Sequence, residues 1–138
     1  MKMLTDHFRE DELRCRCGCG KLILHPGLAE ALEDLRRELD QPMTITSACR
    51  CKAHNDRPAA EGGAGGHSKS LHVCDAAQHP GQMGCLAVDV AAPDGTYRGK
   101  LFSIAWRRGW SIGWNAKRGF LHLDRRVWIG MQQTTFDY

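Results

Sequence analysis

Hydrophobic residues recur at helical spacing between residues 26 and 40. Four leucines carry the pattern, at intervals of four, three and four residues: Leu28, Leu32, Leu35 and Leu39. This spacing places all four on one side of a helix, and the charged residues between them form a solvated side. The pattern predicts a scaffold helix over residues 26–40, with Pro26 in its first turn and Pro42 ending it.

Shorter apolar runs further along the chain predict strands. Residues 43–47 alternate around β-branched side chains, and residues 110–114 and 119–124 predict the two strands of a hairpin. Residues 86–92 form an apolar run that is interrupted by one carboxylate, that of Asp89. A buried carboxylate is costly unless it is paired or bound to a metal, so Asp89 is a candidate functional residue.

Two further segments complete the predicted outline. Residues 97–108 have the apolar spacing of a helix, which ends at Gly109. The tail contains apolar residues that we expect to close over the core: Val127, Trp128 and Phe136. No internal repeat or linker interrupts the pattern, so the 138 residues predict one domain over residues 1–138.

Composition excludes several classes of protein. Hydrophobic residues make up 42% of the chain and charged residues 25%, which is typical of a globular domain and not of a disordered one. A net charge of +3 gives no basic stripe, so we expect no binding to nucleic acid. No apolar run approaches the roughly 18 residues of a membrane span, and acidic residues stand where a signal peptide has its apolar core. We therefore expect a soluble product made in the cytoplasm without a signal peptide.

The chain has seven cysteines, and three of them lie at alternate positions near the N-terminus: Cys15, Cys17 and Cys19. In an extended strand these three thiols would share one side, about 7 Å apart from one to the next. That spacing suits neither a disulfide nor a zinc knuckle. Unligated thiols are therefore favoured over a second metal site that recruits Cys49 or Cys51. Without a secretion signal, we expect the thiols to be reduced.

A glycine-rich loop precedes the candidate site, and residues 62–70 read GGAGGHSKS. The run resembles a phosphate-binding loop, but it lacks the glycine that should precede Lys69, and no strand leads directly into it. We predict a loop whose glycines let the backbone pass close to another group.

A small set of side chains carries the chemistry of a metal site. His122 and Asp124 lie two residues apart on a predicted strand and share one side, while the leucines beside them share the other. His72 and Asp89 supply a second imidazole and a second carboxylate. Two imidazoles and one carboxylate with an open fourth position are the ligand set of a catalytic zinc ion.

Several short segments occur in an order that is typical of one enzyme family. In chain order they are His7-Phe8, Glu12-Leu13 and Cys15; Thr46-Ser47-x-x-Arg50-Cys51-x-x-His54-Asn55; Gly62-Gly63; Ser70-x-His72; Gly84-x-x-Ala87-Val88-Asp89; Ile112-Gly113; and Phe120-x-His122-x-Asp124-x-Arg126. On these segments the chain resembles the zinc peptidases of family M15. That family includes D-alanyl-D-alanine carboxypeptidases, murein endopeptidases and phage endolysins. The resemblance covers nearly the whole chain.

The resemblance implies a fold and a ligand set. The implied fold is α+β, a small and mainly antiparallel sheet with helices packed on one side and zinc at the open face, as in Hedgehog and D,D-peptidase domains. The implied zinc ligands are His72, Asp89 and His122. Arg50 matches the family arginine that holds substrate and stabilises the oxyanion, and a guanidinium fork suits both tasks. A surface ion pair is the alternative role for Arg50.

The chain departs from the family in the spacing of its ligands. Sixteen residues separate His72 from Asp89, whereas the corresponding family ligands usually lie much closer together. The difference is an apparent insertion over residues 73–83, which we expect to extend a loop beside the site and shape substrate access. It contains three further potential ligands: Cys74, Asp75 and His79. If the ligand assignment is wrong, His67 and His79 are the replacements.

A second departure concerns the general base. Several branches of the family have an acidic residue three positions before the last zinc histidine, but Gly119 occupies that position here. Asp124 is the nearest carboxylate on the same side, and it is the candidate for a general base or for a group that orients His122. Three more residues are expected at the substrate: Ser70, His54 and Trp114.

These expectations describe a zinc-dependent peptidase that hydrolyses a bond in peptidoglycan stem peptides, as a carboxypeptidase or an endopeptidase. A small single domain is typical of a phage or prophage endolysin, which would reach the cell wall after release by a holin or as part of the virion. A host-encoded peptidase is the second choice. From other classes, the alternatives are a catalytically silent zinc-binding module and a structural phage protein on the same fold. We expect a monomer.

Overall fold

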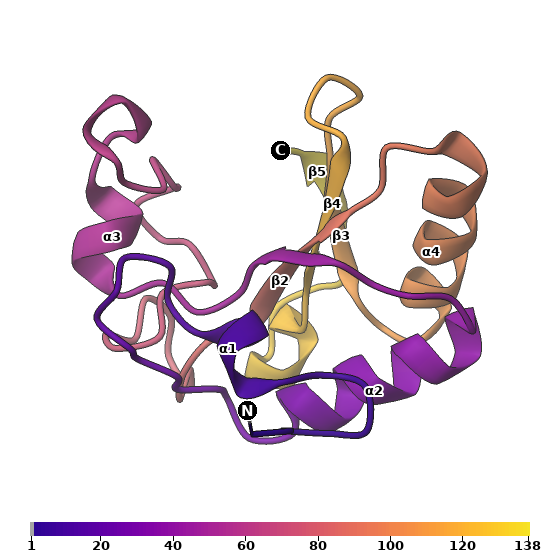
Figure 1. Ribbon diagram of the computed structural model, residues 1–138, viewed down its shortest axis with the longest axis horizontal. Coiled ribbons are helices and arrows are strands. Elements are labelled where there is room, and N and C mark those ends of the chain that lie inside the picture. The colour runs from indigo at the N-terminus through magenta and orange to yellow at the C-terminus, as the bar shows by residue number, and fades with distance from the viewer. Residues whose placement is uncertain (1) are drawn as a thin grey trace.

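The structure, a computed structural model that describes residues 2–138, is organised around one five-stranded sheet. In sheet order the strands are β1 (Ile45–Ser47), β2 (Ala87–Ala91), β4 (Phe120–Asp124), β3 (Ser111–Trp114) and β5 (Thr135–Asp137). Neighbouring strands are antiparallel except β5, which runs parallel to β3. The sheet is mixed but mainly antiparallel, which confirms the α+β prediction (Figure 1).

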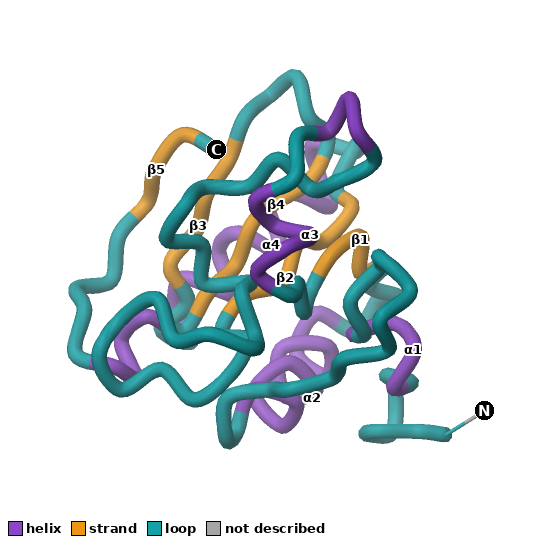
Figure 2. Tube along the Cα trace, turned by 90° about the vertical axis from the view of Figure 1, so that its left-hand side faces the viewer, coloured by secondary structure: helices purple, strands orange, loops and turns teal. Residues whose placement is uncertain are grey.

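The α-helices of the described chain are α1 (Glu10–Leu13), α2 (Leu28–Leu39), α3 (Lys52–Asp56) and α4 (Gly95–Arg107). Helices α2 and α4 pack on one side of the sheet, and both fall where the apolar spacing predicts them. Helix α3 stands on the other side, in front of β2 and β4 in Figure 2, with α4 behind them. Among the described residues, no helix has both the length and the apolar character needed to cross a membrane.

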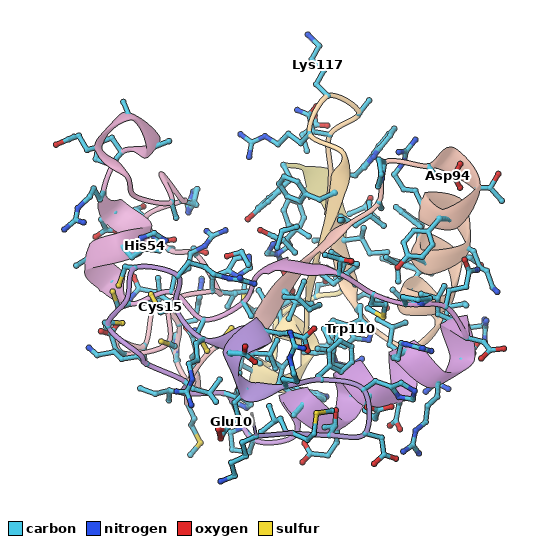
Figure 3. The ribbon with its side chains drawn as sticks, in the orientation of Figure 1. Glu10, Cys15, His54, Asp94, Trp110 and Lys117 are labelled. Carbon is cyan, nitrogen blue, oxygen red and sulfur yellow. The ribbon has the colours of Figure 1, made fainter. Side chains whose placement is uncertain are left out.

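The core fills the space between the sheet and the two long helices. The four leucines of α2 are at most 1% exposed and share one cluster with the inward side chains of β2, β3 and β4. Trp110, labelled in Figure 3, is fully buried in the same cluster. Each large apolar side chain buried in this way stabilises the fold by about 1.5–3 kcal/mol. Helices α2 and α4 thus cover one side of the sheet and leave the other for polar side chains.

The register of the sheet places two of the predicted ligands side by side. Asp89 of β2 is the direct antiparallel partner of His122 of β4. Leu121 and Leu123 belong to the core on the helix side, so the alternate residues of β4 project from the open side. His122 and Asp124 therefore share that side, as predicted.

The C-terminal tail does not close over the core as predicted. Val127 and Trp128 belong to a 3-10 turn, Arg126–Ile129, and the Trp128 side chain is 37% exposed. The tail then forms β5 at the sheet edge, where Phe136 packs against His122 on the open side instead of closing over the core. A strand of three residues shows too little alternation to be predicted from the sequence.

The cysteine run near the N-terminus also differs from its prediction. Residues 16–19 form turns instead of an extended strand, and the thiols of Cys15, Cys17 and Cys19 gather at one place. Gly18 and Gly20 have left-handed backbones, with φ of 90° and 76°, which side chains other than glycine rarely adopt. The prediction of separated thiols assumed an extended strand. Because the backbone turns here, the thiols lie close together instead.

The glycine-rich loop passes close to its neighbours, as predicted. A Cβ atom on Gly66 would lie 2.2 Å from Oδ1 of Asn55 and 2.8 Å from Nη1 of Arg50. A Cβ atom on Gly63 would lie 2.1 Å from the carbonyl oxygen of Arg57. Residues larger than glycine would therefore displace either the loop or the side chains that it covers.

The segment before α1 is anchored to α2 through a buried carboxylate. The backbone N–H of His7 donates to Oε1 of Glu33 at 2.8 Å, and Nδ1 of His7 lies 2.5 Å from Oε2. Burial alone would raise the pKa of Glu33, but the hydrogen bonds from His7 outweigh it and lower that pKa to about 2. The folded protein therefore keeps Glu33 ionised.

Candidate metal centre

Three side chains from separate segments converge on the open side of the sheet. His72 lies in a loop after α3, Asp89 in β2 and His122 in β4. One ligand atom from each lies within 4.8 Å of the other two. Oδ1 of Asp89 is 3.1 Å from Nε2 of His72 and 3.1 Å from Nδ1 of His122. All three residues are at most 4% exposed, so the chain buries this group of side chains together.

A hydrogen-bond partner holds the second nitrogen of each imidazole. Nδ1 of His72 lies 2.7 Å from the carbonyl oxygen of Ala48, and Nε2 of His122 lies 2.8 Å from Oδ2 of Asp124. Imidazoles that ligate metals almost always donate their other N–H to a carbonyl or carboxylate in this way. A tetrahedral zinc ion with bonds of about 2.0–2.2 Å has ligand atoms about 3.3 Å apart, close to the distances observed here. The donor set therefore fits zinc.

Asp124 is fully buried, and both of its oxygens accept hydrogen bonds. Oδ1 accepts from the backbone N–H and from Nε of Arg126, at 3.1 Å and 2.9 Å. Oδ2 accepts from Nη2 of Arg126 at 2.7 Å and lies beside His122. Burial alone would raise the pKa of Asp124, but the hydrogen bonds from Arg126 and His122 outweigh it and lower that pKa to about 2. The carboxylate is thus held ionised behind the imidazole.

Arg50 is attached directly to the three-residue group. Its Nη2 donates to Oδ2 of Asp89 at 3.1 Å, while Nε donates to Ser47 at 3.0 Å and Nη1 to Asn55 at 3.3 Å. Arg50 is 7% exposed, which excludes the surface ion pair. Burial alone would raise the pKa of Asp89, but the attraction of His72 and hydrogen bonds from both imidazoles hold it well below its usual range.

A pocket of about 380 Å³ opens beside this group. His122, Asp124 and Ser70 line it, and Oγ of Ser70 accepts a hydrogen bond from the backbone N–H of His72 at 3.2 Å. Of the three grouped residues, His122 lines the pocket, so a bound molecule can reach the group at this imidazole.

Two predicted substrate contacts lie away from this pocket. Trp114 pairs with Leu121 in the sheet and therefore points to the helix side, where the guanidinium of Arg98 lies 5.4 Å from its ring. The alternation of the strand thus corrects the prediction that Trp114 lines the cleft. His54 lies on α3 (Figure 3), and its backbone carbonyl accepts a hydrogen bond from Ala64 of the glycine-rich loop at 2.9 Å. His54 does not line the pocket.

The alternative ligands do not join the group. Cys74 is buried in the apolar core, and Asp75 accepts a hydrogen bond from Nζ of Lys21 at 2.7 Å. His67 and His79 line the pocket wall, outside the cluster of ligand atoms. The loop over residues 73–83 therefore contributes to the pocket through His79.

Gly119, at the position where other branches have an acidic residue, lies in the hairpin connection before β4. Its backbone is left-handed, with φ of 69°, and no heavy atom lies within 4 Å of a Cβ built on it. The position therefore has room for a side chain but a backbone conformation that an acidic residue rarely adopts.

Two aromatic residues cover His122: Phe136, which the sequence pattern assigned to the core, and Tyr138, which it did not single out. Ring centroids of Tyr138 and Phe136 lie 4.4 Å and 5.5 Å from that of His122. The hydroxyl of Tyr138 lies 3.5 Å from Oδ2 of Asp89. Burial and the Asp89 charge raise the pKa of Tyr138 to about 12, so the phenol stays protonated. The sequence does contain a signal for this pair. Phe136 and Tyr138 are two residues apart, and alternate residues of a strand lie on the same side of the sheet.

A histidine–aspartate–histidine group with hydrogen-bonded outer partners, at the open side of an α+β sheet, defines a protein with a candidate zinc centre beside a pocket. The family model described as Peptidase M15 matches residues 6–124. The chain therefore belongs to the peptidase M15 family. Searches of curated proteins and of solved structures find no match to this chain.

Proposed function

We propose that this protein is a zinc peptidase that hydrolyses a peptide bond in peptidoglycan stem peptides, as a D,D-carboxypeptidase or an endopeptidase. The observation that carries the proposal is the buried group of His72, Asp89 and His122, with an outer partner on each imidazole. Membership of the peptidase M15 family supports the reaction class. The pocket beside the group supplies a place for the substrate.

His72, Asp89 and His122 would hold the zinc ion. Bound there, zinc supplies Lewis-acid chemistry: it polarises a substrate carbonyl and lowers the pKa of a water molecule. The burial of the three ligands keeps bulk water from competing for their lone pairs, and the register between β2 and β4 fixes two of them relative to each other.

Arg50 acts on both the site and the substrate in this proposal. Hydrogen bonds to Ser47, Asn55 and Asp89 use one N–H on each of its three nitrogens. A guanidinium has five N–H groups, so two of them remain for a substrate carboxylate or a developing oxyanion. The other contacts hold the fork in place, which lowers the cost of orienting it during the reaction.

Asp124 serves as a positioning residue and not as the general base. Its oxygens are occupied by Arg126 and His122, and its low pKa makes it a weak proton acceptor. Tyr138 keeps its proton and lies on the pocket wall, so it can donate a hydrogen bond to the substrate. Ser70 shapes the same wall, while His54 acts on the substrate side only through the loop that it anchors.

We assign the protein to the cell wall as its place of action, with release by a holin or transport on a virion as the route. Within this class, a phage or prophage endolysin is our first choice and a host enzyme the second. We expect the active form to be a monomer, because the ligands, Arg50 and the pocket wall all come from one chain.

The test is digestion of purified peptidoglycan, with products identified by mass spectrometry. The wild-type protein should release D-alanine or cut stem peptides, lose this activity with a chelator and regain it with zinc. His122→Ala should be inactive, whereas His25→Ala, which changes a histidine outside the site, should keep its activity. Intact peptidoglycan after incubation with folded, zinc-loaded wild-type protein would refute the proposal.

A catalytically silent zinc-binding module is the second candidate, and one observation favours it. Gly119 leaves no carboxylate at the position where other branches have one, and Asp124 is fully engaged. A silent module would bind zinc at the same three ligands and lose stability with a chelator, but no bond in peptidoglycan would be cut. The digestion experiment with zinc-loaded protein separates the two.

A further inference from the structure

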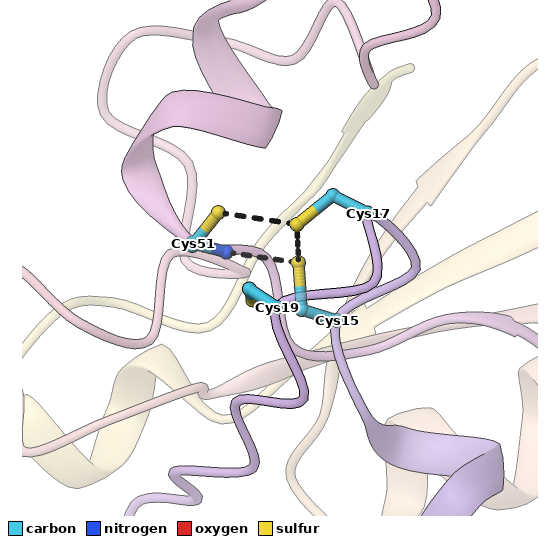
Figure 4. A group of neighbouring side chains, drawn as sticks. All are labelled: Cys15, Cys17, Cys19 and Cys51. Carbon is cyan, nitrogen blue, oxygen red and sulfur yellow. Dashed lines mark hydrogen bonds between the residues drawn. The ribbon is translucent and has the colours of Figure 1, made fainter.

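A second cluster of possible metal ligands lies on the same side of the molecule as α3. The sulfur atoms of four cysteines lie within 4.8 Å of one another (Figure 4): Cys15, Cys17, Cys19 and Cys51. Sγ of Cys17 is 3.4 Å from that of Cys15 and 3.6 Å from that of Cys51. Cys15 and Cys51 are buried, whereas Cys17 and Cys19 are exposed. The cluster is thus anchored on one side and open to solvent on the other.

Two distant segments build the cluster. The first curls over residues 15–21, where the backbone N–H of Cys15 donates to the carbonyl of Lys21 at 3.0 Å and closes the turn. The second contributes Cys51, the residue before α3. Asp75 joins the two segments, because one carboxylate oxygen accepts from Nζ of Lys21 and the other from the backbone N–H of Lys52. The thiols therefore meet on a framework that other contacts also hold.

The geometry matches a tetrahedral site with four sulfur ligands. Zinc–sulfur bonds of about 2.3 Å in a tetrahedron place the sulfur atoms about 3.8 Å apart. The observed separations of 3.4 Å and 3.6 Å, and the 4.8 Å limit for the whole group, lie near this value. Small movements of the two exposed side chains would complete the match.

Backbone donors already point at two of the sulfur atoms. The N–H of Cys51 donates to Sγ of Cys15 at 3.3 Å, and the N–H of His54 donates to Sγ of Cys51 at 3.4 Å. Donors of this kind stabilise the negative charge of metal-bound thiolates. The three other cysteines differ, since Cys49, Cys74 and Cys85 are buried in the apolar core.

We propose that Cys15, Cys17, Cys19 and Cys51 form a structural zinc site that is separate from the histidine–aspartate–histidine group. Binding converts the thiols to thiolates and releases their protons to the solvent. All four positions of the tetrahedron are then filled by protein, so the site has a structural and not a catalytic role. Its effect is to fix the N-terminal segment to Cys51, the neighbour of Arg50, and thereby to hold the guanidinium at Asp89.

The experiment measures metal content and sulfur ligation under reducing conditions, in the His122→Ala protein. This background removes the other centre but leaves the cysteines, so the outcome does not depend on the proposed peptidase activity. We expect one bound zinc per chain, and after replacement by cobalt an intense sulfur-to-cobalt charge-transfer absorption. Both should be lost in His122→Ala/Cys17→Ser/Cys19→Ser, whose added substitutions lie at exposed positions.

A matched control separates the cluster from the other thiols. Cys74→Ala changes a buried cysteine outside the cluster and should keep both the zinc and the cobalt spectrum in the same background. Reduced His122→Ala protein that takes up no zinc, or cobalt without a sulfur charge-transfer band, would overturn the proposal. Disulfides among the four cysteines in protein purified under reducing conditions would overturn it as well.

Discussion

At the scale of single residues, hydrogen bonds fix which nitrogen of each imidazole faces the candidate metal site. The carbonyl of Ala48 can only accept, so the neutral form of His72 carries its proton on Nδ1 and leaves a lone pair on Nε2. The ionised Asp124 accepts from Nε2 of His122 in the same way and leaves Nδ1 with the lone pair. Metal ligation needs neutral imidazoles in these tautomers, so a bound metal would take the place of the hydrogen bonds from the two rings to Asp89, while the contacts with Ala48 and Asp124 keep each ring in place.

Replacing Asp124 tests this orienting role. In Asp124→Asn the amide can donate to Nε2 of His122, which moves the ring proton to Nδ1 and blocks ligation there. We expect zinc affinity to fall about 10- to 100-fold, measured by competition with a chromogenic chelator. If Asp124 is the general base instead, zinc affinity will be retained and kcat alone will fall. Asp34→Asn, an exposed carboxylate on α2, is the control and should change neither quantity.

Gly66 offers a second test at this scale, because it lies against the arginine of the site. A methyl group at this position would meet Oδ1 of Asn55 at 2.2 Å and Nη1 of Arg50 at 2.8 Å. We expect Gly66→Ala to lower kcat/KM by up to about 100-fold, since small displacements of a positioning group have effects of this size. Gly99→Ala, where a methyl group meets nothing within 4 Å, should retain activity. Equal activity of the two variants would show that Gly66 does not hold Arg50.

The residues that the structure gathers at the candidate site were largely predictable, and their contacts were not. His72, Asp89 and His122 stand out in the sequence as polar residues in apolar surroundings or in matched segments. The sequence leaves Asp124 with two roles, because only the structure shows that Arg126 and His122 occupy its oxygens. Trp114 was misplaced because the face on which a strand residue lies depends on its pairing register.

At the scale of elements, β5 is the part of the sheet that brings the tail to the site. It pairs in parallel with β3, and Phe136 lies opposite Gly113. A Cβ atom on Gly113 would lie 2.7 Å from Cε2 of Phe136 and 3.0 Å from Cβ of Tyr138. The absence of a side chain at Gly113 is therefore what allows the two aromatic rings to rest on His122.

Gly113→Ala should destabilise the protein by about 1–3 kcal/mol, because the added methyl group overpacks the contact with Phe136. Urea denaturation of Gly113→Ala, Phe136→Ala and the double variant measures the coupling between the two positions. The double variant should lose less free energy of unfolding than the sum of the single variants, since the smaller side chain leaves room for the methyl group. Strictly additive losses would indicate that the two residues do not contact each other.

The link between the N-terminal segment and α2 makes stability depend on pH. The pKa of Glu33 falls from its ordinary 4.5 to about 2 on folding, so its contribution is complete above pH 4.5 and disappears as the pH falls towards 2. Glu33→Gln should cost about 1.5–3 kcal/mol at pH 7, the usual value of hydrogen bonds to a charged group. The difference from wild type should shrink below pH 4.5 in denaturation experiments. Glu30→Gln, exposed on the same helix, should show no difference at either pH.

Helices and strands with clear periodicity were predictable, and short irregular elements were not. The four leucines of α2 predicted both the helix and its buried side. The turn over residues 16–19 depends on the left-handed backbones of Gly18 and Gly20, which a pattern of alternating thiols cannot indicate. Strand β5 forms because an edge of β3 is available, a tertiary contact that the local sequence does not contain.

At the scale of the whole molecule, one short segment connects the two clusters of candidate metal ligands. Ala48 lies behind His72, Arg50 binds Asp89, and Cys51 belongs to the cysteine cluster. A metal at either place therefore restrains the same piece of backbone. We expect the two clusters to contribute to stability together.

Removal of metal should lower the melting temperature, measured by scanning fluorimetry with and without a chelator. A site at a free metal concentration about 1,000 times its Kd stabilises the fold by about 4 kcal/mol, so the loss should be large and reversible with zinc. The decrease should be smaller in Cys17→Ser/Cys19→Ser, which retains one of the two clusters. A melting temperature that does not change with chelator would count against metal binding at both.

The long connection between His72 and Asp89 is anchored at both ends. The backbone N–H of Arg50 donates to the carbonyl of His72, and Asp89 is fixed within β2 by pairing with β4. The part of the intervening chain that lines the pocket, around His79, can therefore change in sequence without moving either ligand. Selection can then act on this segment as an exchangeable module: a new pocket wall, and with it a new substrate preference, can be acquired while the metal chemistry is inherited unchanged.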